Sequence, residues 1–422
     1  MPRALRYARS IGKSDSSEGP PKVLRQGTHR SRSLDYTVNR ALRLAPVMGI
    51  TRVANVTGLD TVGVPVVMVC RPNSRSVAVS QGKGIDLASA RASGLMEAAE
   101  LYHAETITLP LRLATHEELR YQHNVVDVND LPRGSGSHFH PNLRILWSEG
   151  RDLLSGEKIF VPYEMVHTNY TTPSLQGHGC FTASSNGLAS GNDTMEATSH
   201  AICEVVERDA TTLWELTGEE ERAKRRLDLE SVDERLCRET LRKLDRAGLS
   251  VAVWEITSDI KIAAFACNVV PRSDNTMWHC AVATGYGCHP VREVALLRSL
   301  TEAAQTRLTL ISGLRDDFRR DTYEQLLDPH LVEAVRHRIF ASKPKRRMAD
   351  VPTRDEETCA ADVAWELKCL KKAGSRHLVV VDLTKTEFGL PVVRVIVPGL
   401  EPMLGPDYRP GRRARAVIIA QS

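Results

Sequence analysis

The stretch that decides the fold reads Ser185-Asn-Gly-Leu-Ala-Ser-Gly-Asn192, a glycine loop that leads into a predicted helix ending near residue 214. One face of that helix carries four polar residues within about 80° of arc, at about 100° per residue: Glu196, His200, Glu204 and Glu207. Apolar Val205 and Val206 flank this face. An acidic stripe on an otherwise buried helix is costly unless its charge is compensated, and a divalent cation is the natural compensation.

The same combination of glycine loop and acidic helix occurs at two other places. Gly82-Lys-Gly84 precedes a predicted helix over 86–105, and Gly285-Tyr-Gly287 precedes one that ends near residue 310. In two copies the last loop glycine lies 13 residues before a paired glutamate, at 84 to 97 and at 191 to 204. The paired positions on the two further helices are Glu97 with Glu100 and Glu302 with Gln305. The repeat predicts three related loop–helix units.

Carboxylates on several helices, together with glycine loops and basic side chains, predict a site for Mg²⁺ and a polyphosphate, because Mg²⁺ binds carboxylate and phosphate oxygens. On one helix alone, two glutamates three residues apart usually mark a solvated face. Three copies of the pattern favour the site instead. None of the loops is a Walker loop or the dinucleotide fingerprint. Lys83 is equally compatible with a phosphate ligand and with a surface lysine.

No nucleophilic catalytic set can be assembled from the sequence, so the catalytic residues stay unknown. Three histidines beside the acidic helices are expected to be structural or to act behind the ligands: His103, His200 and His289.

The composition is that of an ordinary globular protein, with 422 residues, 42% apolar and 26% charged. The net charge of +4 gives little support for nucleic-acid binding by bulk charge, and no apolar run is long enough for a membrane span. Nine scattered cysteines and the lack of a secretory signal predict free thiols in the cytoplasm.

Strands and helices alternate along the chain, but many strands follow one another as hairpins, which favours an α+β (mixed α/β) fold over a parallel sheet. We expect residues 1–25 to form a mobile basic tail and residues 26–422 a single composite domain. Within that domain, the charged residues 315–354 are expected to form a surface excursion.

At these motifs the sequence resembles the YcaO family, ATP-dependent enzymes that activate peptide backbone amides. The resemblance covers about residues 28–400. It rests on Ser80-Gln-Gly-Lys-Gly84, Ser93-Gly-Leu-Met-Glu97-Ala-Ala-Glu100, Ser185-Asn-Gly-Leu-Ala-Ser-Gly-Asn192, Glu204-Val-Val-Glu-Arg-Asp209 and Leu300-Thr-Glu-Ala-Ala-Gln-Thr-Arg307. It implies a YcaO-type ATP-binding fold with three related loop–helix units and antiparallel-rich sheets. It departs from the family after the first pair of glutamates. The family often has Glu-Arg there, whereas in this chain Leu101 follows Glu100.

The resemblance also implies roles for individual residues. Those that would hold Mg²⁺ are Glu97, Glu100, Glu196, Glu204 and Glu207. Those that would contact phosphates or nucleotide are Arg30, Thr37, Ser93, Asn192, Arg208, Gln305 and Arg307. Lys83 joins this group as the phosphate ligand that the first glycine loop suggests. For the arginine of the third helix, Arg315 is the alternative to Arg307.

The implied reaction phosphorylates the amide oxygen of a peptide after a nucleophile has attacked its carbonyl. A Cys, Ser or Thr side chain as nucleophile gives an azoline, as in a cyclodehydratase, and external sulfide gives a thioamide. The chain ends Arg-Ala-Val-Ile-Ile-Ala-Gln-Ser422 without a proline-rich tail. With the string Glu100-Leu-Tyr-His-Ala-Glu105, this favours thioamide formation beside a TfuA-like partner.

Two alternatives to the thioamide prediction are kept, an azoline-forming cyclodehydratase and a non-catalytic accessory protein. We expect a peptide or protein substrate, no nucleic acid and no membrane partner. A homodimer is left open.

Overall fold

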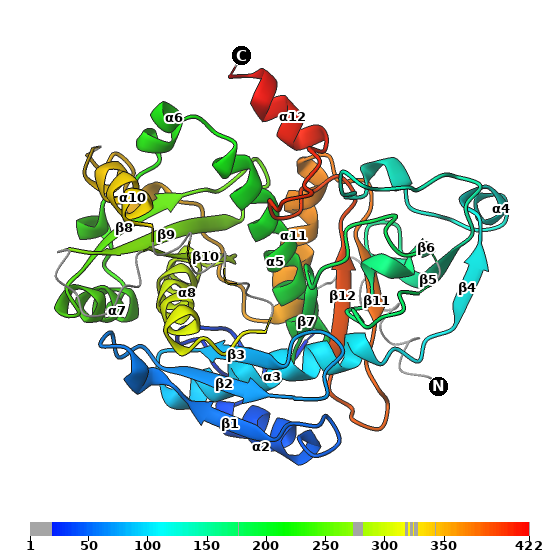
Figure 1. Ribbon diagram of the computed structural model, residues 1–422, viewed down its shortest axis with the longest axis horizontal. Coiled ribbons are helices and arrows are strands. Elements are labelled where there is room, and N and C mark those ends of the chain that lie inside the picture. Colours follow the sequence, from blue (N-terminus) through cyan, green and yellow to red (C-terminus); the bar gives the residue numbers. More distant parts are fainter. Residues whose placement is uncertain are drawn as a thin grey trace.

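Each sequence repeat forms a strand followed directly by a helix that lies across it (Figure 1). The computed structural model describes residues 19–175, 177–272, 282–316, 320, 324, 328–341 and 343–421. The three strand–helix units are β3 (Val79–Lys83) with α3 (Leu87–Glu105), β7 (Leu188–Ser190) with α5 (Thr194–Glu215), and β10 (Ala283–His289) with α8 (Arg292–Ser312).

The prediction of a flexible glycine loop is wrong in the first and third copies. Gly82 lies in β3, and Gly285 lies in β10. A Cβ atom on Gly82 would overlap the backbone of Ala90 and Gly94 in α3. A Cβ atom on Gly285 would meet the backbone of α8 in the same way. These glycines therefore let a helix backbone lie directly against a strand backbone, and they do not form a mobile loop.

Each repeat strand lies at one end of an antiparallel sheet. The first sheet has the order β1-β2-β3, with β1 (Arg52–Asn55) and β2 (Val66–Cys70). The second has the order β10-β9-β8, with β8 (Leu249–Glu255) and β9 (Ala263–Pro271). The third has the order β4-β5-β11-β12-β7, and β6 also pairs with β5.

The remaining strands of the third sheet are β4 (Leu111–Ala114), β5 (Ile145–Asp152), β6 (Lys158–Pro162), β11 (Val379–Asp382) and β12 (Val392–Ile396). The other described α-helices are α2 (Leu34–Leu44), α4 (His116–Arg120), α6 (Glu219–Lys224), α7 (Arg235–Arg246), α10 (Pro329–Ala341), α11 (Cys359–Lys372) and α12 (Arg412–Ile419). Short 3-10 helices span Thr57–Leu59, Val128–Asp130, Tyr163–Met165, Leu229–Ser231 and Met348–Asp350.

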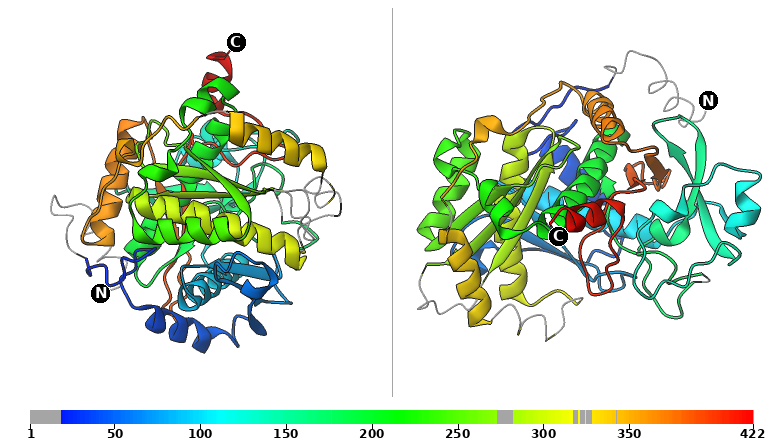
Figure 2. Two further views of the ribbon diagram at one scale, coloured as in Figure 1. Left: turned by 90° about the vertical axis from the view of Figure 1, so that its left-hand side faces the viewer. Right: turned by 90° about the horizontal axis from the view of Figure 1, so that it is seen from above.

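The second sheet separates two hydrophobic clusters, because successive strand residues point to opposite faces. Val253 and Phe265 pack in the cluster that includes α7 and α8. Trp254 and Ala266 pack in the cluster that includes α5, α10 and α11. A third cluster forms around Trp147 in the third sheet. The first sheet and α2, drawn in blue, lie below α8 in Figure 1 and in the left view of Figure 2.

The predicted tail and the predicted excursion are both partly packed against the body. Residues 1–18 lie outside the described residues, but Lys22 is buried and pairs with Asp362 of α11 at 2.7 Å. Within 315–354, α10 inserts Val335 and Ile339 into the core. Among the described residues, no helix is long and apolar enough to cross a membrane.

We expect Gly285→Ala to lower the free energy of unfolding by about 1–3 kcal/mol or more, because the added methyl group overlaps the α8 backbone. Thermal unfolding followed by circular dichroism measures the effect. Gly58→Ala is the matched control, since a Cβ atom there meets nothing within 4 Å. Equal melting temperatures for the two variants would show that close packing does not fix this glycine.

Candidate active site

The three strand–helix units close into a ring, because each helix also contacts the strand of another unit. The α3 helix touches β7, α5 touches β10, and α8 touches β3. A hydrogen bond or ion pair spans each of these contacts, and Figure 1 shows the three helices meeting near the middle of the molecule. The spanning pairs are Ser190 Oγ to Glu100 at 2.7 Å, Tyr286 Oη to Glu215 at 2.7 Å, and Lys83 Nζ to Glu302 at 2.5 Å.

Five carboxylates from the three helices share one electrostatic environment inside this ring. Glu97 of α3 interacts with Glu302 of α8, Glu100 of α3 with Glu204 of α5, and Glu207 of α5 with Glu302. The Glu204 side chain is 20% exposed and the Glu207 side chain 5% exposed. The ring therefore holds a largely desolvated cluster of negative charge, which we call the carboxylate cluster.

Burial dominates the protonation of this cluster. It raises the pKa of Glu100 to about 8 and that of Glu204 to about 7. Burial also raises the pKa of Glu97 and Glu207. For Glu302, burial acts in the same direction, but the charges of Lys83 and Arg208 outweigh it and lower the pKa. Nearby cations of the chain thus compensate only part of the negative charge.

The donor set of the carboxylate cluster fits a hard divalent cation. Carboxylate oxygens are the ligands that Mg²⁺ prefers, and Mg²⁺ completes its shell with water and phosphate oxygens. Within the described residues, no three acidic, His or Cys side chains form a ready-made metal site.

Arg208 and Lys83, both predicted to contact nucleotide, lie within the carboxylate cluster. Arg208 Nη1 lies 3.6 Å from Glu207 Oε1, and Arg208 Nη2 lies 4.0 Å from Glu204 Oε1. Lys83 Nζ also donates to Gln305 Oε1 at 3.1 Å. Ser93 lies one helical turn before Glu97 on α3. These positions put two cations and two neutral polar groups beside the carboxylates.

Glu196, a predicted metal ligand, lies in a separate group at the start of α5. Its carboxylate accepts from Arg30 Nη1 at 3.2 Å, from Ser31 N and Oγ at 2.9 Å each, and from Asn192 Nδ2 at 3.1 Å. Thr37 Oγ1 bonds Asn192 Oδ1 at 3.0 Å. The predicted residues of the N-terminal segment and of the second loop are thus brought together by Glu196. We call these five residues the N-terminal group.

The two alternatives for the third-helix arginine differ in their surroundings. Arg307 is 5% exposed and forms a two-pronged ion pair with Asp60, at 2.8 Å and 3.1 Å. Arg315 instead lowers the pKa of Glu97, although burial outweighs that effect. Arg315 is therefore the arginine that faces the carboxylate cluster, whereas Arg307 is engaged in the core.

Two groups near the cluster were not assigned from the sequence. Glu302 belongs to the third repeat but is not among the ligands that the sequence predicts. Its place in the repeat is the signal that could identify it. Arg394 of β12 is 1% exposed and interacts with Glu204. It has no motif around it, so no local pattern could have identified it.

Of the three histidines expected to be structural, His103 and His289 are buried, and His200 is half-buried. His103 Nδ1 contacts the backbone oxygen of Ala99 at 2.7 Å, and His200 Nε2 contacts Arg298 at 2.9 Å. Burial lowers the pKa of His103 to about 4, so this histidine is neutral at neutral pH. His289 packs edge-on against His29.

Comparison with known proteins identifies relatives over most of the chain. A family model described as YcaO cyclodehydratase, ATP- and Mg²⁺-binding, matches residues 81–401. A protein of Rhizobium leguminosarum bv. trifolii, described by its position in the tfuA 3′ region, is 36% identical and covers 85% of this chain and 86% of its own length. A protein of Methanothermobacter thermautotrophicus is 34% identical over 88% of this chain and 95% of its own.

Two solved structures share the fold. A heterocyclase in complex with substrate and cofactor gives a TM-score of 0.76 at 23% identity over 94% of this chain, which spans 55% of that protein. YcaO from Methanopyrus kandleri bound with AMPPCP and Mg²⁺ gives a TM-score of 0.71 at 22% identity, over 93% of this chain and 100% of that one. The predicted fold class, and ATP and Mg²⁺ as the cofactors of this type of protein, are confirmed.

We expect the metal-free protein to lose stability relative to a Glu100→Gln variant as the pH rises from about 4.5 to about 8. Below this window both folded and unfolded states hold the Glu100 proton. Within it only the unfolded state releases the proton, so folding is penalised, and above it the penalty is constant. Glutamine resembles the protonated acid and does not titrate.

Urea unfolding of both proteins in EDTA, at about pH 5 and about pH 9, measures this difference. At the higher pH, the free energy of unfolding of the variant should rise relative to that of the unmodified protein. A stability difference that is the same at both pH values would contradict a raised pKa at Glu100.

Proposed function

Because this chain belongs to the YcaO family, we propose that it activates backbone amides of a polypeptide by ATP- and Mg²⁺-dependent phosphorylation of the amide oxygen. The observation that carries the proposal is the carboxylate cluster, in which three different helices direct partly uncompensated carboxylates into one ring. A purely structural acidic cluster would be paired with cations. Part of the negative charge of this cluster has no partner in the described parts of the chain, and Mg²⁺ bound together with a nucleotide would balance it.

In this proposal, Glu97, Glu100, Glu204 and Glu207 hold Mg²⁺, with Glu302 as an additional member of the set. Mg²⁺ would neutralise charge on the phosphoryl group during its transfer. Lys83 and Arg208 would orient phosphate oxygens beside the cluster. Both cations now bind carboxylates, so they would exchange these partners for phosphate when nucleotide and metal arrive together.

The N-terminal group has a different role in the proposal. Its five residues are already connected by hydrogen bonds, so Glu196 acts as an anchor that holds Arg30 and Thr37 at the start of α5. Asn192 and Arg30 would then present nitrogen donors to the nucleotide. We infer that Glu196 positions these donors and is not part of the Mg²⁺ shell formed by the carboxylate cluster.

Thioamide formation with a TfuA-like partner is the branch that we favour. The relative described by its position in the tfuA 3′ region supports it. The main alternative is azoline formation. The structural likeness to a heterocyclase supports this alternative. In both reactions the nucleophile comes from the substrate or from sulfide, so the chain itself needs no covalent nucleophile.

We expect Glu97→Gln and Glu204→Gln each to weaken Mg²⁺·ATP binding at least about tenfold, because each removes a negative oxygen ligand. Isothermal titration calorimetry measures the affinity. Glu149→Gln is the matched control, since Glu149 is an exposed residue that pairs with Lys158 on the surface. Unchanged affinity in both cluster variants would disprove the site assignment.

Mass spectrometry of a peptide incubated with the protein, Mg²⁺·ATP, sulfide and a TfuA-like partner separates the branches. Replacement of oxygen by sulfur in the peptide is the expected result. Loss of one water from a Cys, Ser or Thr peptide would instead establish azoline formation. If no candidate peptide and partner stimulates phosphate release from ATP, the result would favour the non-catalytic accessory role.

A further inference from the structure

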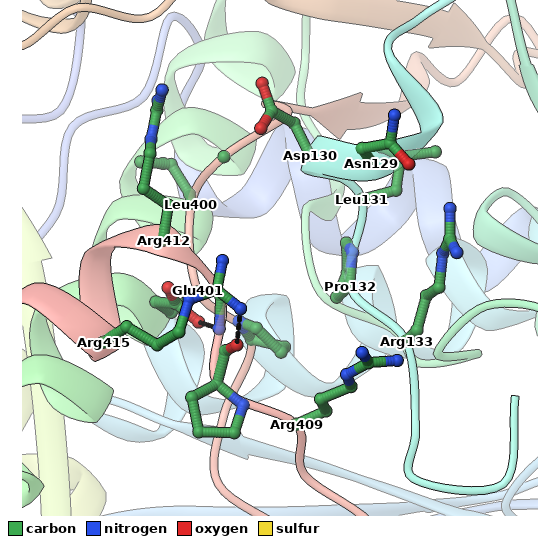
Figure 3. Close-up of a pocket in the computed structure, with 14 residues that line it drawn as sticks. Asn129, Asp130, Leu131, Pro132, Arg133, Leu400, Glu401, Arg409, Arg412 and Arg415 are labelled. Carbon is green, nitrogen blue, oxygen red and sulfur yellow. Dashed lines mark hydrogen bonds between the residues drawn. The ribbon is translucent and has the colours of Figure 1, made fainter.

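A second site candidate is a cavity of about 190 Å³ that is lined by other residues (Figure 3). One wall is formed by residues 129–133, at the 3-10 helix Val128–Asp130. The other comes from residues 399–402 and from residues 409–415, where α12 begins. No residue of the carboxylate cluster or of the N-terminal group lines this cavity.

The cavity is positively charged. In Figure 3, Arg133 and Arg409 lie on one side of it and Arg412 and Arg415 on the other. Arg409 and Arg412 are exposed, and within the described parts of the chain their side chains take part in no hydrogen bond or ion pair. Arg133 Nε is buried without a partner there.

The two acidic residues of the lining do not neutralise these arginines, because each already has partners elsewhere. Asp130 pairs with Arg376 at 2.9 Å. Glu401 accepts from Gly411 N at 2.9 Å, from Ala414 N at 2.9 Å and from Tyr408 Oη at 2.8 Å, and so caps the start of α12. The guanidinium groups are therefore held near one another by the fold without matching anions.

The rest of the lining suits a polypeptide better than a nucleotide. Apolar groups from Leu131, Pro132, Leu400 and Pro402 lie between the two sides of the cavity. No aromatic residue lines it, so no platform exists for stacking a base. Guanidinium groups around an apolar floor match carboxylate side chains on an extended chain, since arginine binds carboxylates in a two-pronged geometry.

The cavity wall is connected to the carboxylate cluster through a short segment. Glu401 N donates to Asp209 Oδ1 of α5 at 3.0 Å, and Arg208 Nη1 contacts Met403 Sδ at 3.7 Å. Residues 401–403 therefore extend from the cavity to the arginine of the carboxylate cluster. A chain bound in the cavity would lie next to the segment that touches Arg208.

We propose that this cavity binds an acidic segment of the polypeptide substrate, with Arg409 and Arg412 as its principal carboxylate-binding residues. The inference rests on the proposed function, because it takes a polypeptide to be the substrate. Binding there would hold the substrate by a segment other than the amide that reacts. It would also favour substrates that carry Asp and Glu near the modified position.

Fluorescence anisotropy with a fluorescein-labelled hexaglutamate peptide tests the proposal on the full chain. We expect binding that weakens as salt is added, and a loss of at least about tenfold in affinity in the Arg409→Gln/Arg412→Gln double variant. Arg246→Gln, at the exposed end of α7, is the matched control and should bind as the unmodified protein does. Because Arg409 and Arg412 are exposed, the double variant should keep its melting temperature.

Three results would overturn the proposal: equal affinity in the double variant, equal binding of labelled hexaglutamine, or displacement of hexaglutamate by inorganic phosphate at equal charge. Mg²⁺·ATP binding by the double variant keeps the two proposals apart. It should be unchanged, since neither arginine belongs to the carboxylate cluster. A protein that binds hexaglutamate but not Mg²⁺·ATP would contradict the proposed function and support the acidic-segment site.

Discussion

The contact of helix backbone with strand backbone at Gly82 and Gly285 is the constraint on which the rest of the structure depends. Only glycine permits this approach. It brings the strand amides close enough for Tyr286 N to donate to Glu302 at 3.2 Å. With α3 and α8 this close to their own strands, the three units can also reach one another. The positions of the carboxylates therefore depend on this close packing of the backbone.

The ring that results contains more negative charge from carboxylates than the nearby cations of the chain compensate. Desolvation raises the pKa of Glu100 and Glu204 into the neutral range, which means that the protein alone holds protons there that a bound cation would displace. The N-terminal group shows the opposite arrangement, because Glu196 has a full set of donors. The hydrogen bonds of the Glu196 carboxylate are thus satisfied within the chain, whereas the carboxylate cluster keeps negative charge that nearby cations compensate only in part.

Local pattern predicted the helices well, since α3 spans nearly its expected range and α5 ends close to residue 214. It was wrong about the glycine segments of the first and third copies, because contacts between distant parts of the chain decide their structure. A Gly-rich strand and a Gly-rich loop look alike until the helix that covers the strand is placed. The metal-ligand role of Glu196 stays a prediction: Glu196 shares a helix face with Glu204, and eight residues correspond to about 12 Å along the axis. Arg307 pairs with Asp60, whose sequence separation of 247 residues no motif can reveal.

The pairing of Lys83 with Glu302 joins residues 219 positions apart, and this has a consequence during synthesis on the ribosome. At about 5–20 residues per second, Lys83 would emerge about 10–40 seconds before its partner. In the later part of that interval, once α5 has emerged, the nascent chain carries the acidic faces of α3 and α5 without the third unit that closes the ring. The order of translation therefore makes cation binding one of the last events in the maturation of the chain.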